Sequence, residues 1–202
     1  KVLVLEHSPK VAEKIRISGG GRCNFTNLNI TPQNYISSNP HFAVSALKRY
    51  TQHDFTQLIK KHKIEFHEKT LGQLFCNESA IQIINMLLAE CAEECVKILT
   101  STKIEGVEAG YKIKTSTGNF ECESLVVACG GLSVPKTGAS GFGYELAKKF
   151  GHNIVQTRAG LVPFTLDNTA EFAGISVFGA AKIGKTSFTE GMLFTHKGIS
   201  GP

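Results

Sequence analysis

The segment Val2-Leu3-Val4-Leu5 is apolar at every position, and it ends in the acidic residue Glu6. A short apolar run that contains β-branched residues is typical of a strand covered on both faces, as in the parallel sheets of α/β proteins. Residues 1–6 are therefore predicted to form such a strand. The segment Leu125–Cys129 has the same character and runs straight into Gly130-Gly131, so it predicts a second buried strand.

The stretch between these two strands changes character once. Residues 30–95 are predicted to be mostly helical, with a short strand at Ile64–His67. Residues 103–123 alternate between apolar and polar residues around short turns, which predicts a small antiparallel β meander. A further helix is predicted over Gly143–Phe150, and the Gly-rich residues from Leu161 onward have the composition of strands.

Residue types that favour the start of a helix locate three helices within residues 30–95. Helix starts favour a capping Ser, Thr, Asp or Asn, Pro at the first helical position, and Gln or Glu three residues after the cap. On these grounds three helices are predicted: residues 40–50 after Asn39, a short helix from the cap Asp54 to Lys61, and a longer helix opened by the capping box Ser79-x-x-Gln82.

Composition and charge narrow the class of protein. The chain has 202 residues, of which 42% are hydrophobic and 19% charged, so it is neither disordered nor membrane-spanning in composition. Its formal net charge is +5. The densest cationic run, Lys60, Lys61 and Lys63, is interpreted as the solvated end of a helix. The mild charge argues against nucleic acid as a partner. No stretch approaches the length of a transmembrane helix, so no membrane partner is expected, and the expected partner is a small-molecule substrate.

The cysteines argue against a metal site. The chain has six cysteines, none of them in a Cys-x-x-Cys pair, so a zinc ribbon is unsupported and no metal is expected. Thiols scattered among apolar neighbours are typical of a reducing compartment, which predicts a cytoplasmic protein.

Ser18-Gly19-Gly20-Gly21-Arg22-Cys23-Asn24, which we call the glycine loop, is the strongest candidate site. Three residues without Cβ atoms allow backbone amides to approach a ligand closely. Arg22 adds a permanent planar cation that suits a diphosphate. The alternative is a flexible turn, but Ser, Arg and Asn on both sides of the glycines favour binding of an anion or cofactor.

Two strand ends are weaker candidates. An acid at the end of a strand, here Glu6, can accept hydrogen bonds from both ribose hydroxyls in dinucleotide-binding folds, although many strands end in Glu at the surface. Gly130-Gly131 allows a ligand to approach the sheet edge, and its alternative is a simple tight turn.

Gly179–Thr186 matches the phosphate-loop pattern G-x-x-x-x-G-K-[ST] at every position. A phosphate loop needs a strand before it and a helix after it. The residues after Thr186 are β-formers with no helical pattern, so Gly184-Lys185 is interpreted as the turn of a hairpin. A P-loop nucleotide-binding protein remains an alternative function.

Together these segments have a family resemblance. Lys1–Glu6, the glycine loop, Leu125–Gly131, Gly141–Ala147 and Leu193–Pro202 occur in the order expected for the HI0933-like (BaiN-like) bacterial NAD(P)/FAD-dependent flavoproteins, which the whole chain resembles. The resemblance implies an α/β, Rossmann-like FAD-binding domain over residues 1–160 and the start of an inserted β-rich domain over residues 161–202. The first β-GxGxxG-α unit would precede Lys1, so the chain is expected to be an internal fragment that by itself binds FAD poorly.

The resemblance also implies contacts to FAD. Glu6 would hold the adenosine ribose, Lys14 and the glycine loop would lie along the diphosphate, and the backbone near Ile104 would contact adenine. The residues expected to bind the cofactor are Glu6, Lys14, Ser18, Gly19, Gly20, Gly21, Arg22, Cys23, Asn24, Ile104, Ala128, Cys129, Gly130 and Gly131. This chain departs from the family with Ala12-Glu13 where Gly-Arg is usual, and with Cys129 in place of Thr.

The expected activity follows from the resemblance. It implies an FAD-dependent oxidoreductase that passes hydride from NAD(P)H through FAD to an organic acceptor. The alternative from another class is a flavin-containing protein that binds or modifies RNA, since flavoproteins of broadly similar fold act on tRNA. No residue of this sequence is assigned as catalytic.

Overall fold

Strand β1 (Leu3–Leu5) confirms the prediction of a strand at the start of the chain. In the computed structural model it pairs in parallel with β5 (Lys97–Leu99), in the register Leu3 to Lys97. The prediction that both faces are covered is wrong, because Val2, Leu3 and Val4 are exposed. In the described part of the chain, β1 pairs with β5 alone, and this two-stranded sheet leaves most of β1 open to solvent.

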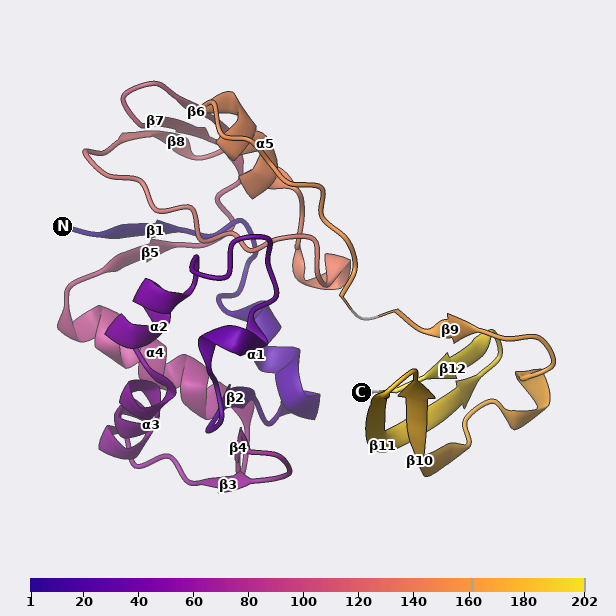
Figure 1. Ribbon diagram of the computed structural model, residues 1–202. Helices are drawn as coiled ribbons and strands as arrows, with labels where there is room; N and C mark the ends of the chain where they lie inside the picture. Colours follow the sequence, from indigo (N-terminus) through magenta and orange to yellow (C-terminus); the bar gives the residue numbers. More distant parts are fainter. Residues whose placement is uncertain (161, 202) are drawn as a thin grey trace. The chain divides into compact units, whose positions relative to one another are not determined.

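The structure describes residues 1–160 and 162–201, so Leu161 and Pro202 lie outside it. The chain divides into two units, Lys1–His152 and Asn153–Pro202 (Figure 1). The boundary predicted between residues 160 and 161 stays a prediction. No helix in the described residues has the length and apolar character needed to cross a membrane.

Helix α4 (Ala80–Glu93) is the longest helix of the first unit. The Ser79 side chain caps it by accepting a hydrogen bond from the Ile81 amide at 3.2 Å. The predicted reciprocal hydrogen bond between the Gln82 side chain and the Ser79 backbone is absent. The side-chain amide group of Gln82 instead donates to the Glu78 carboxylate at 3.0 Å. Packing buries one side of α4, comprising Ala80, Ile83, Ile84 and Met86.

Two other helix starts differ from the prediction. Helix α2 covers Val44–Arg49 and not residues 40–50. Asn39 does accept a hydrogen bond from the His41 amide, but the backbone that follows makes i→i+3 turns before the helix begins. Helix α3 (Gln52–Lys61) is capped by Thr51, which accepts from the Asp54 amide. Asp54 closes the capping box from inside the helix by accepting from the Thr51 amide at 2.7 Å.

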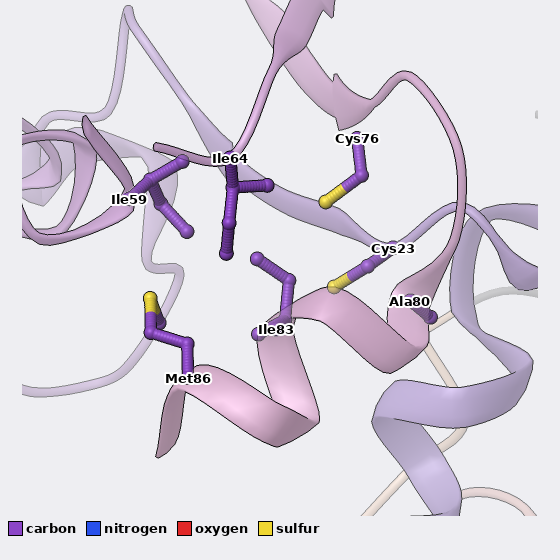
Figure 2. Close-up of a cluster of buried hydrophobic side chains, with 7 residues drawn as sticks. All are labelled: Cys23, Ile59, Ile64, Cys76, Ala80, Ile83 and Met86. Carbon is purple, nitrogen blue, oxygen red and sulfur yellow. The ribbon is translucent and has the colours of Figure 1, made fainter. Parts of the chain in front are cut away.

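Two strands of a three-stranded antiparallel sheet lie within residues 30–95, which the sequence predicts to be mostly helical, and the third comes from the segment before them. The order of the sheet is β2 (Asn24–Asn27), β4 (Gln73–Cys76) and β3 (Phe66–Glu68), of which β3 confirms the strand predicted at residues 64–67. The sheet contributes to the main hydrophobic cluster of the unit. Figure 2 shows the buried members of this cluster, which come from the sheet region, α3 and α4: Cys23, Ile59, Ile64, Cys76, Ala80, Ile83 and Met86.

The predicted meander is confirmed over β6 (Ile104–Glu108), β7 (Lys112–Thr115) and β8 (Gly118–Glu121). The predicted helix after it is also confirmed, as α5 (Phe142–Lys149). Leu146 of α5 packs against Val107 and Ile113 of the meander in a second hydrophobic cluster.

The predicted strand at Leu125–Cys129 is wrong. These residues form no strand, and Val126 and Val127 are exposed. A strand requires a hydrogen-bonded neighbour, and no described segment pairs with this one.

The second unit contains an antiparallel sheet in the order β10 (Ser176–Ile183), β11 (Thr186–Thr195), β12 (Gly198–Ser200) and β9 (Phe164–Thr165). Gly184 and Lys185 form the turn between β10 and β11, and Gly184 has a φ of +56°. The hairpin interpretation is therefore confirmed. The P-loop alternative for Gly179–Thr186 is wrong, because a strand and not a helix follows the motif.

The remaining elements are short. They are α1 (Glu13–Ile17) and the 3₁₀ turns η1 (Ser18–Gly21), η2 (Pro32–Asn34), η3 (Pro135–Thr137) and η4 (Ala170–Phe172).

We expect Ile59→Ala to lower the free energy of unfolding by about 2–5 kcal/mol, because the side chain is 0% exposed and its loss leaves a cavity among its neighbours. Ile81→Ala is the matched control on α4, where the side chain is 38% exposed, and it should cost less than about 1 kcal/mol. Urea denaturation measures both. Equal losses would contradict the assignment of Ile59 to the core.

Acid should weaken the contact between α3 and α4. The Glu90 carboxylate lies 2.6 Å from His62 Nε2 and 2.7 Å from Lys61 Nζ, and these hydrogen bonds lower the pKa of Glu90 below its ordinary value of 4.5. The folded state therefore favours ionised Glu90 more than the unfolded chain does. This stabilisation is complete above pH 4.5 and is lost as the pH falls through the lowered pKa.

The measurement is unfolding stability against pH for Glu90→Gln, compared with Glu93→Gln. Glu93 approaches Lys61 Nζ only at 3.8 Å. We expect Glu90→Gln to be less stable than the parent at neutral pH and to lose the difference in acid, while Glu93→Gln keeps the parental pH dependence. Parallel curves for Glu90→Gln and the parent would refute the assignment.

Candidate functional site

The glycine loop adopts a backbone that glycine accommodates best. Gly19, Gly20 and Gly21 have φ of +56°, +66° and +85°, in the left-handed region. A Cβ on Gly19 would lie 2.8 Å from the Asn24 amide nitrogen and 2.7 Å from the Phe75 ring, whereas one on Gly20 or Gly21 would point into open space. Gly19 is thus required by packing, and the next two glycines keep the backbone accessible.

Two cations flank this loop. Arg22 is exposed, and its carbonyl accepts a hydrogen bond from the Cys76 amide at 3.0 Å, which ties the loop to β4. Lys14, on α1, is exposed and its ammonium donates to Ser133 Oγ at 3.1 Å. Glu13, the residue that departs from the family pattern, accepts from Arg16 Nε at 3.1 Å, so a cation on the same helix offsets its charge.

Within the glycine loop, the Cys23 thiol is buried. Burial raises its pKa, and burial also raises the pKa of Cys76 in the same cluster to about 11. Both side chains are therefore neutral thiols at physiological pH, and neither is a nucleophile or an anionic ligand there. Cys23 would therefore contact a cofactor through its backbone or through packing of its neutral side chain.

A cleft of about 280 Å³ opens beside the glycine loop. Four of the residues expected to bind the cofactor line it: Lys14, Ser18, Cys23 and Asn24. Such a volume is at the lower end for small-molecule pockets, so it suits part of a dinucleotide and not the whole of it. Apolar residues complete the lining, namely Ile15, Phe25, Phe55 and Ile83.

Glu6 lies in a different cleft, of about 200 Å³. Its carboxylate accepts a hydrogen bond from the Ser8 amide at 2.8 Å and lies 3.2 Å from His7 Nδ1. The other lining residues come from β1, β5, α4 and the segment before α1: Val4, Val11, Ala12, Ile84, Leu87, Leu88, Cys91 and Ile98. Residues of α4 line both clefts, and α1 or the residue before it contributes to each.

The segment Ala128–Gly131 packs against α5. A Cβ on Gly131 would lie 2.6 Å from the Tyr144 hydroxyl, and one on Gly143 would lie 3.1 Å from Cys129 Sγ. Gly131 thus lies directly against the Tyr144 side chain, and the expected contact of the Gly-Gly pair with a cofactor stays a prediction.

The loop after Gly131 connects the candidate segments. Ser133 accepts the hydrogen bond from Lys14, and Gly138 packs directly against the His7 ring beside Glu6. The loop after Gly131 therefore contacts the Lys14 side chain at one end and His7, the neighbour of Glu6, at the other.

Ile104 lies in the first unit, in the same hydrophobic cluster as Leu5, the residue before Glu6. It begins β6, pairs with Thr115 and packs with the hydrophobic cluster of the meander. Its expected contact to adenine stays a prediction, as do the other contacts expected with the cofactor.

Sequence analysis missed the apolar wall of the first cleft. Phe55 is the clearest case, because it stands at the start of α3 on the same helical face as Leu58 and Ile59. That spacing identifies the buried face of α3 but not the cleft that Phe55 reaches, which depends on the pairing of β2 with β4.

Comparison with known proteins identifies relatives over the full chain. Aligned over 212 residues, the chain is 49% identical to the ribosomal RNA dihydrouridine synthase of Escherichia coli (strain K12), of which the alignment covers 53%. It is 46% identical to the protein of the same name from Haemophilus influenzae, covering 53%. It is 27% identical to the 3-dehydro-bile acid delta(4,6)-reductase of Clostridium scindens, covering 52%. The chain thus spans about half the length of these curated relatives.

A match to a protein-family model indicates the fold as well as the relatives. Residues 1–194 match the model described as HI0933-like protein Rossmann domain. The match includes the parallel β1–β5 pair, the glycine loop and most of the second unit. The chain therefore belongs to the HI0933-like family.

Proposed function

We propose that the whole protein is a flavin-dependent oxidoreductase that reduces uridine in ribosomal RNA. The observation that supports this most is the 49% and 46% identity, over all of this chain, to two proteins named ribosomal RNA dihydrouridine synthase. The relative named as a bile acid reductase is 27% identical. Making dihydrouridine from uridine and the reaction of a reductase are both two-electron reductions of an organic acceptor, which fits the expected class of enzyme.

The acceptor proposed here changes one expectation. The mild net charge and the solvated lysine run argued against nucleic acid as a partner, and the names of the two more similar relatives do not support that argument. Net charge over a whole chain says little about where the charge is concentrated.

The residues of the first unit fit a dinucleotide cofactor. Gly20 and Gly21 leave open space at a backbone held in the left-handed region, so an anionic group can approach without meeting a Cβ. Arg22 and Lys14 supply positive charge on either side, and the Arg16–Glu13 pair offsets the nearby acid. FAD is the cofactor we propose, with its diphosphate at the glycine loop and a ribose hydroxyl pair at Glu6.

The chemistry then divides between cofactor and chain. A bound flavin supplies the two-electron transfer, with NAD(P)H as the proposed reductant. In this chain, Lys14 and Arg22 offset the diphosphate charge, and the Glu6 oxygen not bonded to Ser8 is available as an acceptor. The apolar wall of Phe25, Phe55 and Ile83 limits water in the cleft.

The proposed reaction has a direct test. The purified whole protein is incubated with NAD(P)H and ribosomal RNA from cells that lack it, and the RNA is digested and analysed by mass spectrometry. We expect one uridine-containing fragment to gain two hydrogen atoms, because the C5=C6 bond of uracil becomes saturated. RNA that stays unchanged, while the protein reduces a steroid-type enone, would contradict the proposed acceptor and retain the reductase class.

FAD binding is tested by Arg22→Gln. The exposed guanidinium stabilises no described ion pair, so its loss should leave the fold intact and weaken FAD binding by roughly tenfold or more. Fluorescence titration of the apoprotein with FAD measures the change.

Lys185→Ala is the matched control for Arg22→Gln. It removes an exposed cation from the turn between β10 and β11, so FAD affinity should stay at the parental value. An unchanged affinity for Arg22→Gln would argue against a diphosphate at the glycine loop.

A further inference from the structure

The positive charge of the chain is concentrated in one stretch that contains no acid. No Asp or Glu occurs between Glu13 and Asp54, although the stretch holds Lys14, Arg16, Arg22, Lys48 and Arg49. The whole chain has 22 Lys and Arg against 17 Asp and Glu. These five cations therefore equal the entire net charge of +5, and the rest of the chain is balanced.

Most of these cations face solvent. Lys14, Arg22, Lys48 and Arg49 are exposed, and none of them is in an ion pair within residues 1–160 and 162–201, whereas Arg16 pairs with Glu13. The denser lysine run at residues 60–63 differs, because Lys61 is held by Glu90 at 2.7 Å. Exposed cations without a counter-charge are the ones available to an anionic partner.

The second half of the stretch also exposes aromatic rings. We call residues 28–51, between β2 and α3, the basic arm (Figure 1). Phe42 is 58% exposed, Tyr50 is 55% exposed and Tyr35 is 41% exposed, while Ile36 is 99% exposed. Ala43 is the one buried residue of the arm. Exposed rings are available to stack against a partner.

The arm begins and ends at the first cleft. Its two ends are held together by a hydrogen bond from the Gln52 side chain to the Leu28 carbonyl at 3.0 Å. Asn24 and Phe25 of β2 line the cleft and lie within four residues of the start of the arm, and Phe55 of α3 lines the same cleft four residues after its end. A polymer bound to the arm is therefore next to the cleft at which we place the cofactor.

We propose that the basic arm binds single-stranded RNA, with Lys48 and Arg49 at phosphates and with bases stacked on Phe42 and Tyr50. This inference rests on the proposed function and assigns its RNA-binding surface. Exposed rings among cations favour unpaired nucleotides, because a stacking platform requires bases that are free of a duplex. An acidic protein surface would use the cations but not the rings, which makes it the weaker fit.

The test uses the whole protein and a fluorescein-labelled, uridine-containing RNA of about a dozen nucleotides, a length within the range of single-strand binding sites. Fluorescence anisotropy gives the affinity at several salt concentrations. We expect Lys48→Gln with Arg49→Gln to weaken binding more than about tenfold. The slope of log K against log salt should become shallower by about 1.4, since each single-strand phosphate contact contributes about 0.7.

The aromatic contribution is tested at Tyr50. Loss of one stacked base typically weakens binding by about tenfold, so Tyr50→Ala should bind less tightly with an unchanged salt slope. Tyr50→Phe keeps the ring and should retain the parental affinity.

Lys60→Gln with Lys63→Gln is the matched charge control. It removes two exposed cations just outside the acid-free stretch and should leave both affinity and slope near the parental values. Flavin content and NAD(P)H oxidation with a small artificial acceptor should be parental in every variant, which excludes a general loss of fold.

Three outcomes would overturn the inference: parental affinity and slope for the Lys48/Arg49 variant, an equal loss in the Lys60/Lys63 control, or tighter binding of the corresponding RNA duplex. Each of these can occur while the parent still reduces ribosomal RNA, and the proposed function then stands. If the parent neither reduces nor binds RNA, the proposed function fails as well.

Discussion

The burial of helix α4 is the interaction on which the first unit depends. Ile83 and Met86 pack into the main cluster with Ile59 of α3 and Cys76 of β4, while Ile84 and Leu87 line the cleft beside Glu6. One helix thus supports the β2–β4–β3 sheet and the region of the parallel pair. Helix α1 packs on α4 and leads directly into the glycine loop. The placement of the loop therefore follows from hydrophobic packing several elements away.

Local signals predicted the elements whose contacts are local. The β6–β8 meander and α5 need only turn residues and helical spacing, and both were confirmed. The β2–β4 pairing joins Asn24 to Phe75, far along the chain, and no local pattern specifies it. The cap of α3 was assigned to Asp54, because Thr51 and Asp54 are both capping residue types, and only the backbone shows which one is outside the helix.

The candidate site was predictable in kind but not in arrangement. The three glycines and Arg22 identified an anion-binding loop from residue type alone, and the family resemblance added Glu6 and Lys14. Sequence could not show that Glu6 and the loop line different clefts, or that Gly131 lies against the Tyr144 hydroxyl. For charge, the densest lysine run was the obvious feature, yet Glu90 offsets Lys61, whereas Lys48 and Arg49 are in no ion pair within the described residues.

The burial of two of the cysteines affects which thiols of the protein are oxidised first. The six cysteines are free, and Cys23 and Cys76 are buried in the cluster beneath the glycine loop, while Cys95 and Cys129 are exposed. Peroxide and electrophiles react with accessible thiolates, so surface thiols are consumed before the buried pair. An enzyme of the proposed class generates such oxidants when a reduced flavin meets oxygen. Because Cys23 is protonated and buried, its sulfur atom can lie beside the cleft and still be oxidised later than the exposed thiols.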